Sequence, residues 1–143
     1  MENKDVFKAV HDVVFGTTSN PVWVYYPYDK KIEWVGLSIR SNLTLEVDHL
    51  PRTGYSFSSF LPDEYGEKIL VFRKNIYPFE KTMFLDSQKE YTIFHLQDCT
   101  ASKARVALIP NGVGINYILT YANGDQVQHS REDYGESFVI IEE

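Results

Sequence analysis

The chain has 143 residues, of which 43% are hydrophobic and 24% are charged. These proportions exclude a wholly disordered chain, and the length predicts a single globular domain that spans residues 1–143. Its 20 acidic and 14 basic residues give a net charge of −6, which opposes general nucleic-acid binding because the phosphate backbone is also negative. No apolar run approaches the roughly 20 residues of a membrane-spanning helix.

The cysteine content and the N-terminal sequence both favour a cytoplasmic protein. Cys99 is the single cysteine, so no internal disulfide can form, as is usual in the cytosol. Residues 1–10 carry charges from the second position onward and lack the apolar core of a signal peptide. We therefore expect the chain to act in the cytoplasm and not in a membrane.

Residues 5–15 have the pattern of an amphipathic helix. Their apolar side chains recur at helical spacing, at Val6, Val10, Val13 and Val14. Valine lowers the intrinsic stability of a helix, so such a helix must be held by packing against another element. We expect an N-terminal helix docked on one face of a sheet.

From residue 21 onward the pattern is mainly that of β-strands. Trp23 and Tyr25 alternate with Val22, Val24 and Tyr26 and therefore point to the opposite side of a strand. Residues 27–30 form a turn, and residues 31–39, which contain Trp34, form the returning strand. Both faces carry apolar groups, so either the sheet is covered on both sides or one aromatic face is exposed for binding. The register needed to place Trp34 on one face is not defined by the sequence.

The remaining segments are predicted to extend this sheet. An exception is residues 99–104, which are predicted to form a loop or short helical turn. The sequence contains no recognisable internal repeat and no convincing linker. Further strands are predicted within residues 43–47, 55–60, 68–74, 90–96, 104–110, 115–130 and 136–143. The predicted fold class is α+β, a mostly antiparallel, curved β-sheet with the N-terminal helix packed on one face.

The pair Asn123-Gly124 predicts a tight hairpin with a two-residue type I′ loop, because that turn requires positive φ at both positions. Thr120 would then lie opposite Val127. In this register Tyr117 and Tyr121 share a face with the polar residues Gln126, Gln128 and Ser130. Aromatic and amide groups side by side suit a protein-binding surface or the rim of a pocket. The alternative is an ordinary sheet face near the edge of the core.

Residues 129–136 contain the densest cluster of ionisable groups in the chain. If this segment stays extended, His129, Arg131 and Asp133 share one face. One interpretation is a hydrogen-bonding site for a ligand or for a charge on a partner. The alternative is a solvated loop in which Arg131 forms weak ion pairs with neighbouring carboxylates.

Motifs for catalysis, cofactors and metals are missing from the sequence. It contains no nucleophile elbow, no His-Glu-x-x-His motif and no phosphate-binding P-loop. Its histidines lack the paired spacing of common zinc sites. We therefore expect no cofactor and no metal, and we interpret the chain as a non-enzymatic binding protein.

The high aromatic content of 15% favours a protein partner, because interfaces use tyrosine, tryptophan and phenylalanine for large contact area. The predicted function is a protein-interaction or inhibitor module of the immunity or phage-accessory kind. The candidate binding residues are Trp23, Tyr25, Trp34, Tyr117, Tyr121, His129, Arg131 and Asp133. Two alternatives remain: a small-molecule pocket lined by Trp23, Tyr25 and Trp34, and a small enzyme with dispersed catalytic residues such as His129 with Asp133.

Overall fold

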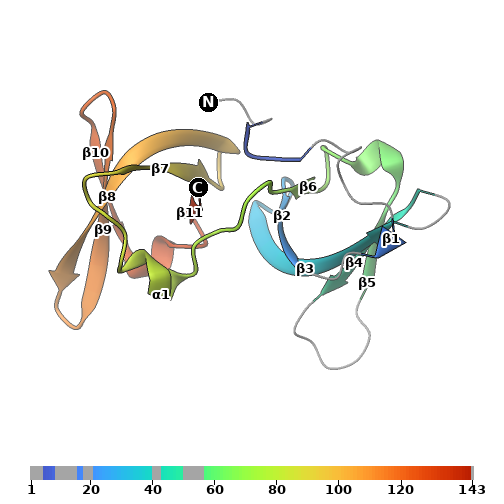
Figure 1. Cartoon of the computed structure of the whole chain (residues 1–143), viewed down its shortest axis with the longest axis horizontal. Coiled ribbons are helices and arrows are strands. Elements are labelled where there is room, and N and C mark those ends of the chain that lie inside the picture. The colour runs from blue at the N-terminus through green and yellow to red at the C-terminus, as the bar shows by residue number, and fades with distance from the viewer. Residues whose placement is uncertain (1–4, 9–15, 18–20, 40–42, 50–56, 143) are drawn as a thin grey trace. The chain divides into compact units, whose positions relative to one another are not determined.

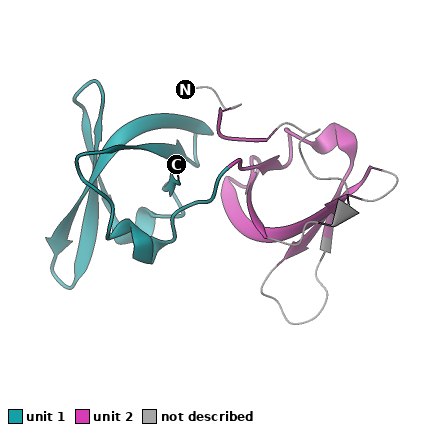
Figure 2. Ribbon diagram, viewed as in Figure 1, with its two compact units in different colours: residues 1–3, 74–143 teal, residues 4–73 magenta. Residues whose placement is uncertain are grey.

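The computed structural model describes residues 5–8, 16–17, 21–39, 43–49 and 57–142 (Figure 1). The chain divides into two compact units, unit 1 with residues 1–3 and 74–143 and unit 2 with residues 4–73 (Figure 2). Each unit has its own sheet and its own hydrophobic core. The single domain expected for residues 1–143 stays a prediction.

Unit 2 is an antiparallel sheet with the strand order β5-β4-β3-β2-β6, and β1 pairs with β3. β6 returns beside β2, and the ribbon of β3 bends strongly along its length (Figure 1). The elements are β1 (Gly16–Thr17), β2 (Val22–Tyr26), β3 (Lys31–Ile39), β4 (Leu45–His49), β5 (Phe57–Phe60), the 3-10 turn η3 (Pro62–Glu64) and β6 (Leu70–Val71). Its core consists of Val24, Val35, Leu37, Leu45, Val47, Ile69 and Val71.

The predicted hairpin of β2 and β3 is confirmed. Its turn closes with Lys30 at φ +55°, where the Lys30 N–H donates to the carbonyl of Tyr26 over 2.8 Å. Trp23 lies opposite Trp34 in the ladder, and side chains directly opposite each other share a face. Because Val24 and Val35 enter the core, both tryptophans lie on the outer face of the sheet.

The predicted α+β fold with an N-terminal helix is wrong. Residues 5–8 do not form an α-helix: Phe7 makes an antiparallel bridge with Phe72, and the Lys8 N–H donates to the carbonyl of Val71 over 2.7 Å. Phe7 is buried at this bridge, and Val6 is buried in the turn that precedes it; an aromatic side chain such as that of Phe7 suits strand pairing. The other positions of the expected helix, residues 9–15, lie outside the described residues.

Unit 1 is a second antiparallel sheet, with the strand order β10-β9-β8-β7-β11. Its elements are α1 (Phe79–Thr82), β7 (Glu90–His95), β8 (Thr100–Asn111), β9 (Gly114–Tyr121), β10 (Gln126–Ser130), the 3-10 turn η4 (Arg131–Asp133) and β11 (Phe138–Ile141). Its core consists of Tyr91, Ile93, Ala104, Val106, Tyr117, Leu119, Phe138 and Ile140. In the described part of the chain α1 is the one α-helix, so the fold is mostly antiparallel β, and no described helix could span a membrane.

The prediction of a loop or short helical turn at residues 99–104 is also wrong, because from Thr100 onward these residues belong to β8. Ala101 and Ala104 are buried, whereas Lys103 and Arg105 are exposed. Alanine has a low strand propensity, but here it packs closely against neighbouring strands, and the packing overrides the propensity. The turn before β8 contains Cys99 at φ +54°.

The β9–β10 hairpin has a different loop from the one predicted. Thr120 lies opposite Gln126 rather than Val127, and the Tyr121 N–H donates to the carbonyl of Asp125 over 2.9 Å. Gly124 has φ +92°, whereas Asn123 does not have positive φ. The type I′ loop is therefore replaced by a three-residue loop with glycine in the left-handed region. This one-residue shift reverses the faces, so Tyr117 lies opposite His129.

We expect Gly124→Val to destabilise unit 1 by about 1–3 kcal/mol, because a β-branched residue resists positive φ. The position is sterically open, with no atom within 4 Å of an added Cβ, so the loss would come from the backbone alone. The denaturant midpoint measures it. Ala122→Val, in the same exposed loop, is the control and should have almost no effect; equal midpoints for the two variants would contradict the loop geometry.

The two units repeat the same order of elements. In each unit four strands follow one another, a 3-10 turn comes next, and a last strand returns beside the first. Val24 opposite Val71 in unit 2 corresponds to Ile93 opposite Ile140 in unit 1.

The turns before the last strands agree in detail. Tyr65 bridges to Ile69, and the Gly66 N–H donates to the carbonyl of Ile69 over 2.9 Å; in unit 1, Tyr134 bridges to Phe138, and the Gly135 N–H donates to its carbonyl over 2.8 Å. The sequences Asp-Glu-Tyr-Gly-Glu at 63–67 and Glu-Asp-Tyr-Gly-Glu at 132–136 mark these turns. The expectation of a chain without a repeat is therefore wrong at the level of structure.

Candidate functional site

The outer face of β2 and β3 in unit 2 carries both tryptophans of the chain. The rings of Trp23 and Trp34 stack with centroids 6.3 Å apart and an interplanar angle of 23°. Trp34 is 50% exposed and Trp23 is partly exposed. A stacked pair of large rings open to solvent is a typical anchor for a partner.

The strand next to these rings supplies small and acidic groups. On the same outer face, Gly36 follows Trp34 by two positions, and Asp48 lies opposite Gly36 in the ladder. A Cβ added to Gly36 would lie 3.6 Å from the Cβ of Asp48, so the absent side chain leaves the surface low between Trp34 and the carboxylate. We refer to Trp23, Trp34, Gly36 and Asp48 as the tryptophan surface.

Tyr25 lies on the same side of β2 as Trp23, but it is only 1% exposed. Its ring stacks on Phe7 with centroids 6.3 Å apart, and Phe7 in turn lies 4.8 Å from the ring of Phe72. The N-terminal segment around Phe7 therefore covers this end of the outer face. Of the three aromatic residues predicted to line a pocket, the structure brings Trp23 and Trp34 together at the surface and places Tyr25 in the core.

On the inner side of the same unit, four polar side chains form a continuous hydrogen-bonded row. The hydroxyl of Tyr26 donates to Glu33 Oε1 over 2.8 Å. His49 Nδ1 lies 2.8 and 2.9 Å from the two carboxylate oxygens of Glu33, and His49 Nε2 lies 2.6 Å from Ser58 Oγ. We call these four residues the polar row.

The strand register explains why the row forms. Three members of the row lie two residues away from a core residue of their own strand: Tyr26 in β2, Glu33 in β3 and His49 in β4. The fourth, Ser58, lies opposite the core residue Val47. They therefore face inward at one end of the core, as diagonal neighbours on adjacent strands. Burial and the hydrogen bond to Glu33 raise the pKa of Tyr26 above its ordinary value, so its hydroxyl remains a donor at neutral pH.

The polar row borders an open hollow of about 380 Å³. Its lining combines three aromatic rings with charged and polar groups: Tyr26, Tyr28, Asp29, His49, Ser58, Phe60 and Lys68. Lys68 Nζ is held by Glu64 Oε2 over 2.7 Å, and the Tyr28 hydroxyl donates to Glu67 over 2.9 Å. The volume falls in the lower range of small-molecule sites.

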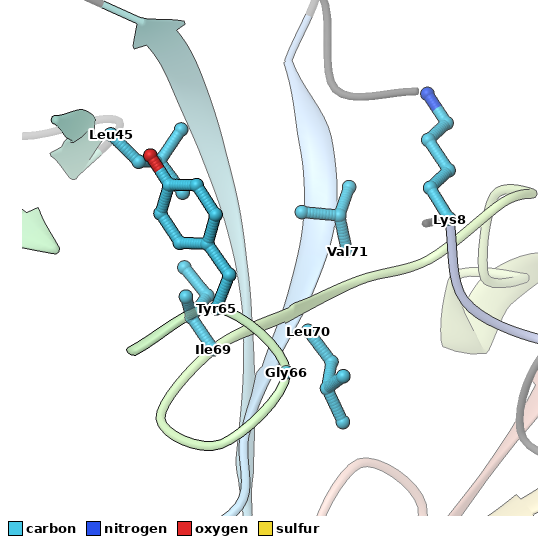
Figure 3. A pocket seen from close by; sticks show the side chains of 7 residues that line it. All are labelled: Lys8, Leu45, Tyr65, Gly66, Ile69, Leu70 and Val71. Atoms are coloured by element: carbon cyan, nitrogen blue, oxygen red, sulfur yellow. The ribbon is translucent and has the colours of Figure 1, made fainter. Parts of the chain in front are cut away.

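A second cavity in unit 2, bordered by Leu45, Tyr65, Ile69 and Val71, is much smaller (Figure 3). Its volume is about 40 Å³, which is close to the roughly 30 Å³ that one water molecule occupies in the liquid. The Tyr65 hydroxyl beside it donates to the carbonyl of Leu43 over 2.6 Å. This cavity is part of the packing around β6 and is too small for an organic ligand.

The predicted site residues of unit 1 divide between its core and the rim of that core. Tyr117 is fully buried, and its hydroxyl lies 2.8 Å from Thr82 Oγ1. Tyr121 is partly exposed, and its hydroxyl lies 3.3 Å from His95 Nε2. His95 Nε2 also lies 3.1 Å from Ser102 Oγ, and burial lowers the pKa of His95.

The cluster at residues 129–133 bends instead of staying extended, because β10 ends at Ser130 and η4 begins at Arg131. His129 Nδ1 lies 3.1 Å from Asp133 Oδ2, so these two predicted site residues do come together. The guanidinium of Arg131 lies 3.6 Å from the ring centroid of Phe79, a cation–π contact in place of the expected local ion pairs.

Tyr26, Glu33, His49 and Ser58 were not predicted as site residues. They lie in four separate sequence segments, and no short motif connects them. The sequence signal that could have indicated the polar row is the presence of polar residues at inward-facing positions of otherwise apolar strands. Which positions face inward is known only once the strand register is known. In the described ranges no group of three or more acidic, histidine or cysteine side chains could hold a metal ion.

Comparisons with protein-family models, curated proteins and solved structures found no match to this chain. Any functional conclusion therefore rests on the chemistry of the described residues.

Proposed function

We propose that this chain acts by binding another protein through the tryptophan surface of unit 2. The observation that carries the proposal is the stacked Trp23–Trp34 pair, of which Trp34 is half exposed although tryptophan gains more than most residues from burial. Exposed tryptophans commonly dominate the affinity of protein interfaces. An interaction or inhibitor module remains the function that this surface fits best.

The chemistry of the surface favours a partner that presents lysine or arginine side chains. Asp48 lies on the same outer face, opposite Gly36 and diagonal to Trp34 in the ladder, and the chain carries a net charge of −6. Cations are attracted both to the face of an indole ring and to a neighbouring carboxylate. The overall negative charge also speeds the encounter with a basic partner at low salt.

The hollow beside the polar row supports a second candidate, the binding of a small molecule. Its volume and its mixture of aromatic and polar walls are those of a ligand site. It lies on the inner side of the sheet and is not lined by Trp23, Tyr25 or Trp34, so occupation of the hollow and occupation of the tryptophan surface can be distinguished.

Intrinsic fluorescence tests the proposal, because both tryptophans of the chain belong to the tryptophan surface. A partner is first captured from lysate of the source cells by immobilised wild-type protein and is then purified. We expect its addition to lower the acrylamide quenching constant of the tryptophans by about twofold or more, because contacts at an interface exclude solvent. If a bound partner left the quenching constant unchanged, it would occupy another surface, and this proposal would be wrong.

A further inference from the structure

The polar row has the order of groups that activates a serine. A carboxylate can only accept hydrogen bonds, so Glu33 accepts them from the Tyr26 hydroxyl and from the Nδ1–H of His49. In that tautomer His49 Nε2 carries no proton and accepts the hydrogen of Ser58 Oγ, which lies 2.6 Å away. A nucleophile, a base and a carboxylate that orients the base are thus joined in sequence.

Accessibility separates this row from a buried structural network. Ser58 and His49 both line the hollow of about 380 Å³, so a substrate atom can reach the serine oxygen and the imidazole together. Tyr26, Tyr28 and Phe60 supply aromatic walls, and Lys68, whose ammonium is held by Glu64 over 2.7 Å, lines the same hollow.

The repeated fold offers an internal comparison. In unit 1 the positions that correspond to Tyr26, Glu33 and His49 are held by His95, Ser102 and Tyr121, as the matching ladders show. That group joins a histidine to two hydroxyls, and among the described residues no carboxylate hydrogen-bonds to His95. Val127 lies opposite Leu119 as Ser58 lies opposite Val47, so unit 1 has no nucleophile at this position.

We propose that Ser58, with His49 as its base and Glu33 as the orienting carboxylate, forms a hydrolytic site for small carboxylic esters that carry an aromatic group. Ser58 Oγ attacks the ester carbonyl carbon while its proton passes to His49 Nε2. The tetrahedral intermediate then breaks its bond to the alcohol oxygen, which leaves with the proton from His49. Water attacks the acyl-serine in the same way, and releases the carboxylic acid and restores Ser58.

A fluorophosphonate probe tests the nucleophile without any protein partner, so a negative result here leaves the proposed binding function untouched. Ser58 Oγ forms a bond to phosphorus and fluoride leaves. We expect intact mass and peptide mapping to place one label on Ser58 of the full chain. Labelling should disappear in Ser58→Ala and slow by about 100-fold in His49→Gln, which lacks the base.

Two serines provide matched controls. Ser59 is exposed on the opposite side of β5, and Ser102 lies beside His95 in unit 1; Ser59→Ala and Ser102→Ala should be labelled like the wild type. Glu33→Gln should slow labelling at least tenfold by removing the orienting charge. Circular dichroism and denaturant midpoints show whether each variant is folded, and Ser58→Ala is the change that disturbs packing least.

Turnover is measured with p-nitrophenyl butyrate, whose aromatic leaving group suits the walls of the hollow. We expect hydrolysis by the wild type to exceed that by Ser58→Ala by at least 100-fold, the size of effect typical of a missing nucleophile or base. An unlabelled Ser58 in the folded wild-type chain, a label on another residue, or equal hydrolysis by Ser58→Ala would each overturn the proposal.

Discussion

Replacement of Tyr25 by alanine is expected to lower the free energy of unfolding of unit 2 by about 3–5 kcal/mol, as for other large aromatic side chains in a core. Tyr25 is 1% exposed and stacks on Phe7. Its removal would leave a cavity beneath the N-terminal segment and would weaken the bridge between Phe7 and Phe72. Small domains are stable by only about 5–15 kcal/mol, so this loss would remove a large part of the total stability.

The denaturant midpoint of the Tyr25→Ala variant measures this effect. Tyr28→Ala is the control, because Tyr28 lies in the turn that follows β2 and is 65% exposed; its single side-chain bond to Glu67 lies at the surface, so we expect a loss below about 1 kcal/mol. A stable Tyr25→Ala protein would instead place this ring in a surface role and would mean that Phe7 does not cover it.

Replacement of Trp34 by alanine is expected to weaken partner binding by about 2 kcal/mol or more, the range of interface hot spots. That free energy corresponds to an increase in Kd of about 30-fold. The stability of unit 2 should change little, because Trp34 is half exposed and its ring contacts Trp23 across the outer face rather than the core. Trp23 is less exposed, so its removal would affect both folding and binding.

Strands were predictable where the local pattern and the tertiary environment agree. The hairpin of residues 22–39 follows from alternating side chains and a Pro-Tyr-Asp turn, and its strand Lys31–Ile39 was located correctly. The helix predicted from Asp5 onward was wrong for residues 5–8, because the helical spacing of apolar residues is only a local signal. The pairing of Phe7 with Phe72 is a long-range contact that sequence periodicity cannot show.

The loop at Gly124 shows how a small error in geometry changes a functional reading. Asn-Gly indicates a hairpin correctly, but both two-residue and three-residue loops use glycine at positive φ. The choice between them moves the register by one residue and exchanges the faces. His129, and not Ser130 as the predicted loop required, therefore lies opposite Tyr117.

The candidate site was predictable only in part, for the same reason. Trp23 and Trp34 could be selected as aromatic candidates, but their stacking required the register of β2 and β3. The polar row requires four strands to be aligned at once, since Tyr26, Glu33, His49 and Ser58 are separated along the chain and meet only through the ladders. Sequence periodicity contains no information on such long-range alignment.

The most direct test of the binding function combines two measurements on the Trp34→Ala variant, the Kd for the purified partner by calorimetry and the denaturant midpoint. Phe84→Ala is the matched control, because Phe84 is an 87% exposed ring in unit 1. We predict a Kd raised about 30-fold at an unchanged midpoint for Trp34→Ala, and wild-type values of both for Phe84→Ala. An unchanged Kd for folded Trp34→Ala protein would contradict the assignment of the tryptophan surface as the binding site.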